Sequence, residues 1–361
     1  MNGVRILNKP LIYLDNAAST KVSNTVFAEA VPYIKDTYAN PSSIHSFGKS
    51  SKKAIEKARE QVAKAINAEP RQIAFTSGAS ESNSWVLHNQ RYAVCSPYEH
   101  HSVSKNAHVQ PTMKLENIIT YETPSIYSHI MVGNETGEIY DVKKMCQIVH
   151  KYNTPFLVDA TQAFSHLRIN VKDLDVDFLS MSGHKFHAMK SIGILYVKEP
   201  DKFSPLIKGG SQEFNLRAGT ENVPAIVSIG KAAELYNYDK NEQDKIALLR
   251  DNFEQKILQN VSDVLINAKD RPRVGNISSL SFKGIEGEAL MLQLDHKGIC
   301  VSSGSACNSG SLEPSHVLQA MGVPDDYIYG TIRVSLSRYT TQEELDYAAD
   351  CIIEIVNNLR Y

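Results

Sequence analysis

The chain has 361 residues, of which 42% are hydrophobic and 22% charged. This is ordinary globular composition, and the length suggests two packed domains or one large α/β unit. The 38 basic and 40 acidic residues leave a formal net charge of -2, which predicts no nonspecific binding to nucleic acid or to a membrane surface. The sequence does not open with a basic segment followed by an apolar run, as a secretory signal would. No apolar stretch approaches the ~20 residues that span a bilayer, so we expect a cytoplasmic protein.

The cysteines form an odd set without a C-x-x-C pair: Cys95, Cys146, Cys300, Cys307 and Cys351. This set indicates neither a disulfide framework nor a zinc knuckle, and no stable metal site is predicted. Any cysteine with a functional role is therefore expected to act as a thiol.

Short apolar runs alternate with amphipathic helical patterns, which is typical of an α/β fold with a mostly parallel sheet. A helix is expected over 50–66, where alanine and valine recur at helical spacing. Buried strands are expected over 72–77, 91–96, 154–160, 177–182 and 193–198.

The order of elements changes in the last third of the chain. A long charged pattern over 231–261 predicts one helix that joins two domains. A final helix is expected from Thr340, with a capping box to Glu343. We predict a large domain over 15–235 and a smaller α+β domain formed by 1–14 with 236–361. Between the long helix and the final helix, the smaller domain is expected to contain strands over 276–282, 299–303 and 331–337 and helices over 286–298 and 313–322.

Polar residues follow several of the expected strands. The turn 76–83 (TSGASESN) offers N–H groups and hydroxyls to a phosphate, although such a turn is also typical of a plain helix cap. Asp159 and Lys185 end two strands, so both are expected at the carboxyl edge of the sheet, where open α/β folds bind ligands. Taken separately they could be an N-cap and a surface charge. Together with the phosphate turn they describe a pyridoxal phosphate (PLP) site, with a Schiff-base lysine and a carboxylate for the ring nitrogen.

Two other residue types could carry chemistry. Cys307 lies in a loop of small residues, VSSGSACNSGSLEP, and the local sequence leaves a nucleophilic thiolate and an inert exposed thiol equally open. His100 and His101 follow strand 91–96 and share the expected sheet edge, where one of them could stack on a planar cofactor.

Ten segments from Tyr13 to the last helix, in one order, point to a family. The chain closely resembles the cysteine desulfurases in these segments, which are YLDNAAST, NPSSIHSFG, FTSGASESN, EHHSV, GNETG, DATQ, SMSGHK, RAGTEN, VSSGSACNSGSLEPSHVL and TIRVSLSRYTTQEEL. These are fold type I PLP-dependent enzymes of the class V aminotransferase group. The resemblance implies an α/β large domain with a mostly parallel, seven-stranded-type sheet and a smaller α+β domain.

The resemblance also implies a role for each matching residue. Lys185 would hold PLP as a Schiff base and move the Cα proton of the substrate, and Asp159 would keep the pyridine nitrogen protonated. Cys307 would be the nucleophile, and His100 would stack on the ring and assist proton transfer. The other contacts would come from Ala79, Ser80, Ser182 and His184 to the phosphate, Gln162 to the ring hydroxyl, Thr220 to the phosphate of the partner subunit, and Asn134 and Arg333 to the substrate carboxylate.

The implied reaction converts L-cysteine to L-alanine and leaves a persulfide on Cys307. An acceptor protein would take the sulfur for iron–sulfur cluster assembly or another thiolation, and Cys307 could transiently ligate such a cluster. The shared site implies a homodimer. Two alternatives remain: a selenocysteine lyase or aminotransferase of the same fold, or a sulfur-relay protein with low turnover.

The sequence departs from the family pattern at the rim of the expected site. Gly133 replaces an asparagine, and the segment 188–191 (AMKS) replaces Gly-Pro-Lys-Gly after the PLP lysine. Milder changes are Ser80, Ser211 and Ala218. The catalytic residues are kept, so altered substrate handling or rate is expected rather than altered chemistry. The sequence stops at Tyr361 without the tail of housekeeping members, which favours a specialised member with a different acceptor.

Overall fold

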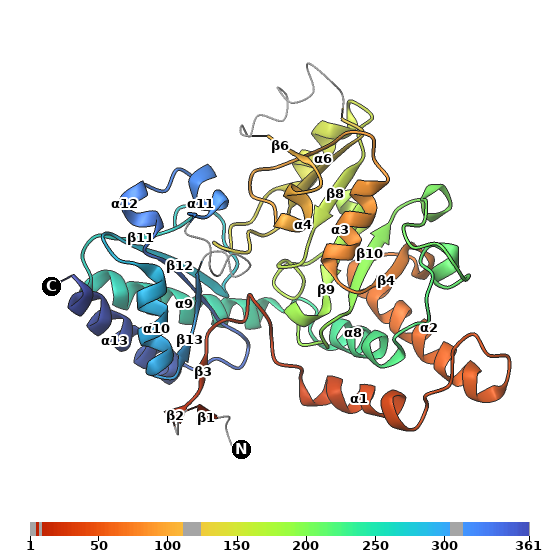
Figure 1. The fold of residues 1–361 in the computed structure, drawn as a ribbon, viewed down its shortest axis with the longest axis horizontal. Helices are drawn as coiled ribbons and strands as arrows, with labels where there is room; N and C mark the ends of the chain where they lie inside the picture. The colour runs from red at the N-terminus through yellow and green to blue at the C-terminus, as the bar shows by residue number, and fades with distance from the viewer. Residues whose placement is uncertain (1–4, 7–8, 111–123, 304–312, 361) are drawn as a thin grey trace. The chain divides into compact units, whose positions relative to one another are not determined.

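The computed structural model describes residues 5–6, 9–110, 124–303 and 313–360 (Figure 1). The chain forms two compact units. The larger unit comprises Thr20–Met131 and Tyr140–Tyr238, and the smaller comprises Met1–Ser19, Val132–Ile139 and Asp239–Tyr361. None of the described helices combines the length and the apolar character needed to cross a membrane.

A seven-stranded sheet in the order β4-β10-β9-β8-β7-β5-β6 forms the centre of the larger unit. The run from β9 to β6 is parallel throughout, whereas β10 is antiparallel to β4 and to β9. The predicted α/β fold with a mostly parallel sheet is therefore confirmed. The strands are β4 (Ile73–Thr76), β5 (Ala93–Cys95), β6 (His108–Val109), β7 (Ile126–Ile130), β8 (Phe156–Asp159), β9 (Phe178–Ser182) and β10 (Gly193–Val197).

Strand β7 lies between β5 and β8 and was not predicted from the sequence. Its residues are all buried, but Ser128 and His129 interrupt the apolar run by which a central parallel strand is recognised. Both polar side chains have local partners: Ser128 donates to Glu99 at 2.9 Å, and His129 contacts the Ile130 carbonyl at 2.7 Å. Burial of these groups is therefore compatible with a central strand.

The predicted helix over 50–66 is confirmed as the greater part of α2 (Ser46–Ile66), which begins one turn earlier because the His45 ring accepts a hydrogen bond from Gly48 at 3.1 Å. Figure 1 shows α2 beside α8 (Val223–Leu235). The two helices approach so closely that a Cβ at Gly230 would lie 2.6 Å from Ala58. The remaining helices of this unit are α1 (Asn24–Lys35), α3 (Ala79–His88), α4 (His101–Ser104), α6 (Val142–His150) and α7 (Val171–Leu174), with 3-10 turns η1 (Pro70–Gln72), η2 (Gly183–Lys185), η3 (Pro200–Lys202) and η4 (Glu213–Asn215).

The prediction of one continuous helix over 231–261 is wrong. Helix α8 ends at Leu235, and α9 (Lys240–Asn260) begins after a new N-cap, Asp239, which accepts a hydrogen bond from Asn241 at 2.9 Å. The Asn237 side chain accepts from the Tyr238 backbone at 2.8 Å, so local side-chain bonds compete with the helix at this point.

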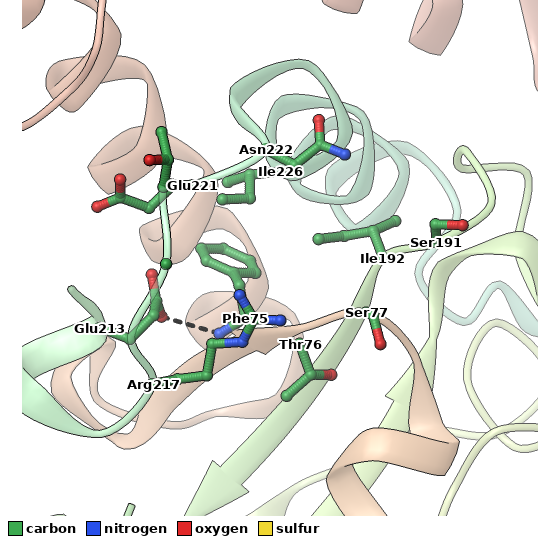
Figure 2. Close-up of a pocket in the computed structure, with 12 residues that line it drawn as sticks. Phe75, Thr76, Ser77, Ser191, Ile192, Glu213, Arg217, Glu221, Asn222 and Ile226 are labelled. Atoms are coloured by element: carbon green, nitrogen blue, oxygen red, sulfur yellow. Dashed lines mark hydrogen bonds between the residues drawn. The ribbon is translucent and has the colours of Figure 1, made fainter. Parts of the chain in front are cut away.

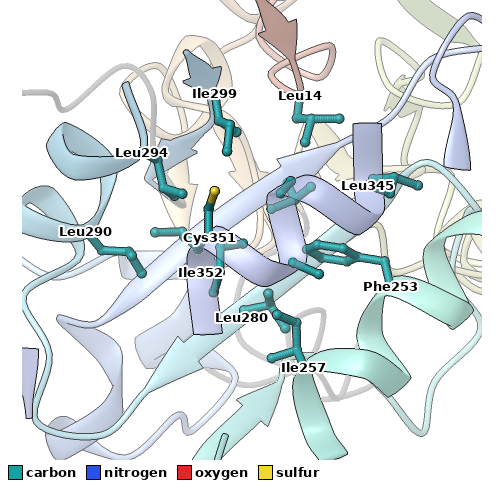
Figure 3. Packing of buried hydrophobic residues seen from close by; sticks show 14 of the residues in the cluster. Leu14, Phe253, Ile257, Leu280, Leu290, Leu294, Ile299, Leu345, Cys351 and Ile352 are labelled. Atoms are coloured by element: carbon teal, nitrogen blue, oxygen red, sulfur yellow. The ribbon is translucent and has the colours of Figure 1, made fainter. Parts of the chain in front are cut away.

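The smaller unit contains an antiparallel sheet in the order β11-β12-β15-β14, and its apolar face packs against helices. Figure 3 shows this core, in which Phe253 and Ile257 of α9 lie with Leu280 and Ile352. The expected α+β architecture is confirmed. Its elements are β1 (Arg5–Ile6), β2 (Lys9–Pro10), β3 (Ile12–Tyr13), β11 (Val264–Ile266), β12 (Ile277–Phe282), α10 (Gly287–His296), β13 (Ile299–Cys300), β14 (Ser302–Ser303), α11 (His316–Ala320), α12 (Asp325–Ile328), β15 (Thr331–Ser335) and α13 (Gln342–Leu359).

Two boundaries differ from the predicted ones. The capping box of α13 is formed by Thr341 and Glu344 rather than by Thr340 and Glu343, because the Thr340 hydroxyl instead accepts from the Ser337 backbone at 2.9 Å. The segments 15–19 and Val132–Ile139, expected in the large domain, fall in the smaller unit. The second of these forms a β-bridge from Glu138 to Arg273.

Candidate active site

Asp159 lies at the carboxyl end of β8 and is 3% exposed. Its Oδ2 accepts a hydrogen bond from Asn83 Nδ2 at 2.9 Å, and its Oδ1 accepts one from the Thr161 backbone at 2.9 Å. Asn83 is on α3, one turn beyond Ala79, so helix and strand together fix the orientation of the carboxylate. The sequence did not assign a role to Asn83, although it ends the FTSGASESN segment.

His100 is connected to Asp159 through two side chains. Ser102 Oγ accepts from Asn83 Nδ2 at 3.0 Å and contacts His100 Nδ1 at 2.9 Å. The Ser102 backbone N–H donates to the same Nδ1 at 3.1 Å. Because a backbone N–H can only donate, Nδ1 is an acceptor, and the neutral ring carries its proton on Nε2.

Lys185 closes η2, directly after β9. Strands β8 and β9 are parallel neighbours with Asp159 opposite Ser180, so Asp159 and Lys185 both belong to the carboxyl edge, as predicted. Thr20 fixes the backbone beside the lysine: its N–H and hydroxyl donate to the His184 carbonyl at 2.8 and 2.9 Å, and its hydroxyl accepts from His187 at 2.7 Å. Sequence reasoning did not identify Thr20, although it ends the YLDNAAST segment.

The turn before α3 brings three of the predicted phosphate contacts together. Gly78 is the N-cap and has no side chain to satisfy the first-turn N–H groups of Ala79 and Ser80. Ser182 Oγ lies 3.8 Å from the position that a Cβ on Gly78 would take. Gly193 allows the close approach of β10, since a Cβ there would lie 2.5 Å from the Gly78 backbone.

The remaining cofactor residues lie around the same edge. Burial, and secondarily the charges of Lys185 and Lys190, lower the pKa of His184 to about 4, so its ring is neutral at pH values above that. Gln162 is buried three residues after Asp159. Thr220 lines a cavity of about 180 Å³ together with Thr76 and Ser77. Figure 2 shows Thr76 and Ser77 in the lining of this cavity.

The larger unit contains a second buried acid, Glu99, at the end of the segment that follows β5. It is fully buried, and burial together with the charge of Asp159 raises its pKa well above the ordinary value. The sequence showed it as part of EHHSV, without a role.

The donor set fits a planar, phosphate-bearing cofactor such as PLP. A lysine, a fixed carboxylate, an imidazole and a hydroxyl-lined helix N-terminus are the groups that hold the carbonyl, ring nitrogen, ring face and phosphate of such a molecule. Among the described residues, Asn83 Oδ1 and Thr161 Oγ1 are buried beside Asp159 without a hydrogen-bond partner. Orphaned polar atoms of this kind are rare unless a ligand or water completes them.

The smaller unit brings Arg333 and Asn134 together. Arg333 is 2% exposed in the middle of β15, and its Nη1 donates to the Asn134 carbonyl at 2.8 Å. Its Nη2 contacts Asp15 at 3.0 Å, and its Nε is buried without a partner among the described residues. The Nε–H of the guanidinium is therefore available to a further acceptor, such as a substrate carboxylate.

The departures from the family pattern have local consequences. Ser191 has φ +58°, a left-handed conformation that glycine adopts at lower cost. Ala188 is fully buried, and its Cβ would lie 3.0 Å from a Cβ on Gly183. At Gly133, a Cβ would lie 3.1 Å from Thr136 Oγ1, so a larger side chain there requires a shift of the turn.

Cys307 lies outside the described residues, so its predicted role is not addressed by the geometry. In the four other cysteines burial is the main cause of a raised pKa: to about 12 for Cys146, and above the ordinary value for Cys95, Cys300 and Cys351. All four are thiols rather than thiolates at neutral pH, which makes them poor nucleophiles.

Known proteins share both sequence and fold with this chain. Residues 12–348 match the family Aminotransferase class-V. Cysteine desulfurase IscS of Dictyoglomus turgidum is 39% identical over 97% of this chain and 95% of its own length. A NifS-like protein from Rickettsia africae superimposes with a TM-score of 0.88 and 31% identity, over 96% of this chain and 99% of its own. The structure titled SspA in complex with cysteine gives a TM-score of 0.78 and 30% identity, over 91% of this chain and 100% of its own.

These matches extend over nearly the whole chain and include the strands, turns and helices that carry the site. The sequence resemblance is thereby confirmed. The chain belongs to the class V aminotransferase family and, within it, to the cysteine desulfurases.

Proposed function

We propose that this protein is a PLP-dependent cysteine desulfurase that converts L-cysteine to L-alanine and passes the sulfur to an acceptor protein. The observation that carries the proposal is the fixed Asp159 carboxylate at the end of β8, next to the strand that leads to Lys185. The cysteine desulfurase named among the relatives and the cysteine bound in a structural neighbour support the choice of substrate.

Each residue of the larger unit has a distinct task in this proposal. Lys185 would hold PLP covalently and carry the substrate Cα proton on its amine. Asp159 would pair with the ring nitrogen, and Gln162 and His100 would contact the ring. Ala79, Ser80, Ser182 and His184 would hold the phosphate, with Thr220 reaching the phosphate of a partner subunit. When bound, PLP supplies an electron sink that stabilises negative charge at the substrate Cα.

The sulfur-transfer step would take place on Cys307. Asn134 and Arg333 would bind the carboxylate of L-cysteine, and the Cys307 thiolate would form an S–S bond with the substrate sulfur. The substrate C–S bond breaks, its electron pair stays with the carbon, and protonation of that carbon gives alanine. The sulfur remains as a persulfide on Cys307, for iron–sulfur cluster assembly or another thiolation.

We further propose that the protein is a homodimer. Five large apolar side chains on α1, on the start of α2 and on the segment between them are exposed in the single chain, including Tyr38 at 74% and Ile44 at 89%. The others are Phe27, Ile34 and Phe47, and Tyr38 and Phe47 form an edge-to-face ring pair at 5.2 Å. A second copy would cover this surface. Light scattering should give twice the mass of one chain, and Ile44→Asp should lower it; a wild-type monomer would contradict the proposal.

The cofactor and substrate are tested with purified protein. The wild type should show a visible absorbance band and form alanine from L-cysteine, and Lys185→Ala should lose both, because it removes the amine that would form the Schiff base. The exposed Lys190→Ala is the matched control and should keep the band. A wild type without the band, or a Lys185→Ala variant that retains it, would contradict the proposal.

The same assay separates the alternatives. A selenocysteine lyase or an aminotransferase would turn over its substrate independently of Cys307. A sulfur-relay protein would accept sulfur from a donor but form little alanine by itself.

A further inference from the structure

An ion pair lies at the turn that precedes α3. Arg217 Nε donates to Glu81 Oε1 at 2.9 Å, and its Nη2 donates to Oε2 at 3.3 Å. Glu81 Oε2 also accepts a hydrogen bond from the Ser77 backbone at 2.8 Å. One carboxylate thus connects the turn before α3 to a loop 136 residues further along the chain.

Glu81 is the third residue of α3, in the turn whose N–H groups face the proposed phosphate site. Burial would raise the pKa of Glu81, but hydrogen bonds from Arg217 and Ser77 outweigh burial and lower it. The side chain is therefore a carboxylate at neutral pH. A phosphate monoester carries a charge of about -1.5 to -2 and competes with this carboxylate for the positive end of the helix. Without a counter-charge, Glu81 would repel the phosphate.

Among the described residues, Arg217 is the cation in ion-pair contact with Glu81, and the side chains of the pair are 25% and 12% exposed. Such partial burial limits solvent screening, so the guanidinium reduces the field of the carboxylate efficiently. The pair also keeps Glu81 turned toward the Ser77 N–H.

A second, deeper ion pair holds the segment that carries Arg217. Glu213 accepts from Arg59 Nη1 and Nη2 at 2.7 and 2.9 Å, and both side chains are 3% exposed. Glu213 also accepts from the Phe75 backbone of β4 at 2.8 Å, which Figure 2 shows. The residues Glu213–Asn215 have φ values of +47°, +58° and +67°. Three successive left-handed residues are costly, so this turn depends on the contacts that hold it.

From these contacts we infer that Arg217 is a positioning residue for the cofactor phosphate: it neutralises Glu81 and holds the Ser77–Gly78 turn, while the Arg59–Glu213 pair fixes its own segment. The inference rests on the proposed PLP function. It assigns part of the phosphate specificity of the turn to a residue that acts through Glu81.

The test is equilibrium binding of PLP and of pyridoxal, which lacks the phosphate, to the full chain freed of cofactor. Arg217→Met should weaken PLP binding on the order of tenfold to a hundredfold. Pyridoxal binding should change less than about threefold, because the repulsion acts on the phosphate. The double variant Glu81→Gln/Arg217→Met should return PLP affinity to within about threefold of wild type, because the repelling charge is gone. Arg217→Lys should also retain PLP binding.

The matched control is Arg71→Met, which removes a cation from the exposed pair with Asp201 and should leave both affinities unchanged. If the double variant binds PLP as weakly as Arg217→Met, or if pyridoxal binding falls equally, charge neutralisation is wrong. Equal PLP binding by Arg217→Met and wild type would overturn the inference and leave the proposed function intact. A wild type that binds no PLP would overturn both.

Discussion

Asn83 donates a hydrogen bond to Asp159 at 2.9 Å, and the two side chains are 0% and 3% exposed. The same amide nitrogen donates to Ser102, which contacts His100, so Asn83 connects the two ring-contacting residues of the proposed site. A single amide on α3 therefore sets the orientation of groups from two other segments.

Asn83→Ala should lower the free energy of unfolding by about 1.5–3 kcal/mol, because it removes a hydrogen bond to a charged group. Asn83→Asp should cost more, since it places a second carboxylate beside Asp159. Urea denaturation measures both, and PLP retention should fall in the same order. The exposed Asn260→Ala on α9 is the control, with an expected change within about 0.5 kcal/mol. Equal stability of Asn83→Ala and wild type would contradict this role.

Two ion pairs of α2, Arg59–Glu213 and Lys57–Glu29, should differ in their contribution to stability. Arg59→Met leaves the Glu213 carboxylate buried without its partner and should lower the free energy of unfolding by about 3–5 kcal/mol. Lys57→Met, on the same helix, breaks an exposed pair with Glu29 and should cost under about 1 kcal/mol. Urea denaturation of the two variants tests the difference, and similar losses would contradict it.

One buried and one partly buried histidine should make stability fall in mild acid. Burial lowers the pKa of His129 and of His184 to about 4 in the folded protein, below the ordinary value of 6.5. As the pH falls from 6.5 toward 4, the histidines therefore take up protons in the unfolded chain before they do so in the folded protein. This stabilises the unfolded chain relative to the folded protein and lowers the free energy of unfolding. Each histidine should contribute up to about 1.4 kcal/mol per pH unit to this slope, as measured by urea midpoints.

Replacement of the histidines tests this pH dependence. His184→Gln should flatten the slope between pH 6.5 and 4, because a neutral glutamine takes up no proton. Between pH 7 and 8 the same variant should show the slope of the wild type. An unchanged acid slope would contradict the lowered pKa of the partly buried His184 imidazole.

Ser191→Gly should raise the free energy of unfolding by about 1 kcal/mol, because glycine adopts a φ of +58° without the steric cost that a Cβ brings. Ser191→Ala keeps the Cβ and should stay within about 0.5 kcal/mol of wild type. Thermal unfolding of the two variants distinguishes strain from loss of the hydroxyl. A glycine variant less stable than the alanine variant would contradict strain at this position.

The sequence predicted the carboxyl edge of the sheet, where the proposed site lies, because polar residues after apolar runs mark where parallel strands end. Asp159 and Lys185 were found in this way. Strand β7 was not, since Ser128 and His129 obscure its apolar pattern. Asn83 and the Arg217–Glu81 pair could not be assigned either, because their partners are distant in sequence and are brought together only by helix and loop packing.

The helix boundaries show the same limit. The pattern over 231–261 has helical spacing on both sides of Asn237, and the break depends on side-chain bonds to single backbone groups. Hydrophobic periodicity does not record such bonds, so it predicted one helix where the structure has two.

In the proposed reaction, Cys307 receives sulfur from L-cysteine with the help of Lys185. Mass spectrometry of the full chain after incubation with L-cysteine tests it most directly. We predict one added sulfur atom on the peptide that contains Cys307, removed by a reducing thiol, absent from Cys307→Ala and Lys185→Ala, and retained in the control Cys300→Ser. A Cys307→Ala variant that forms alanine at the wild-type rate, or a wild type that gains no sulfur, would contradict the account.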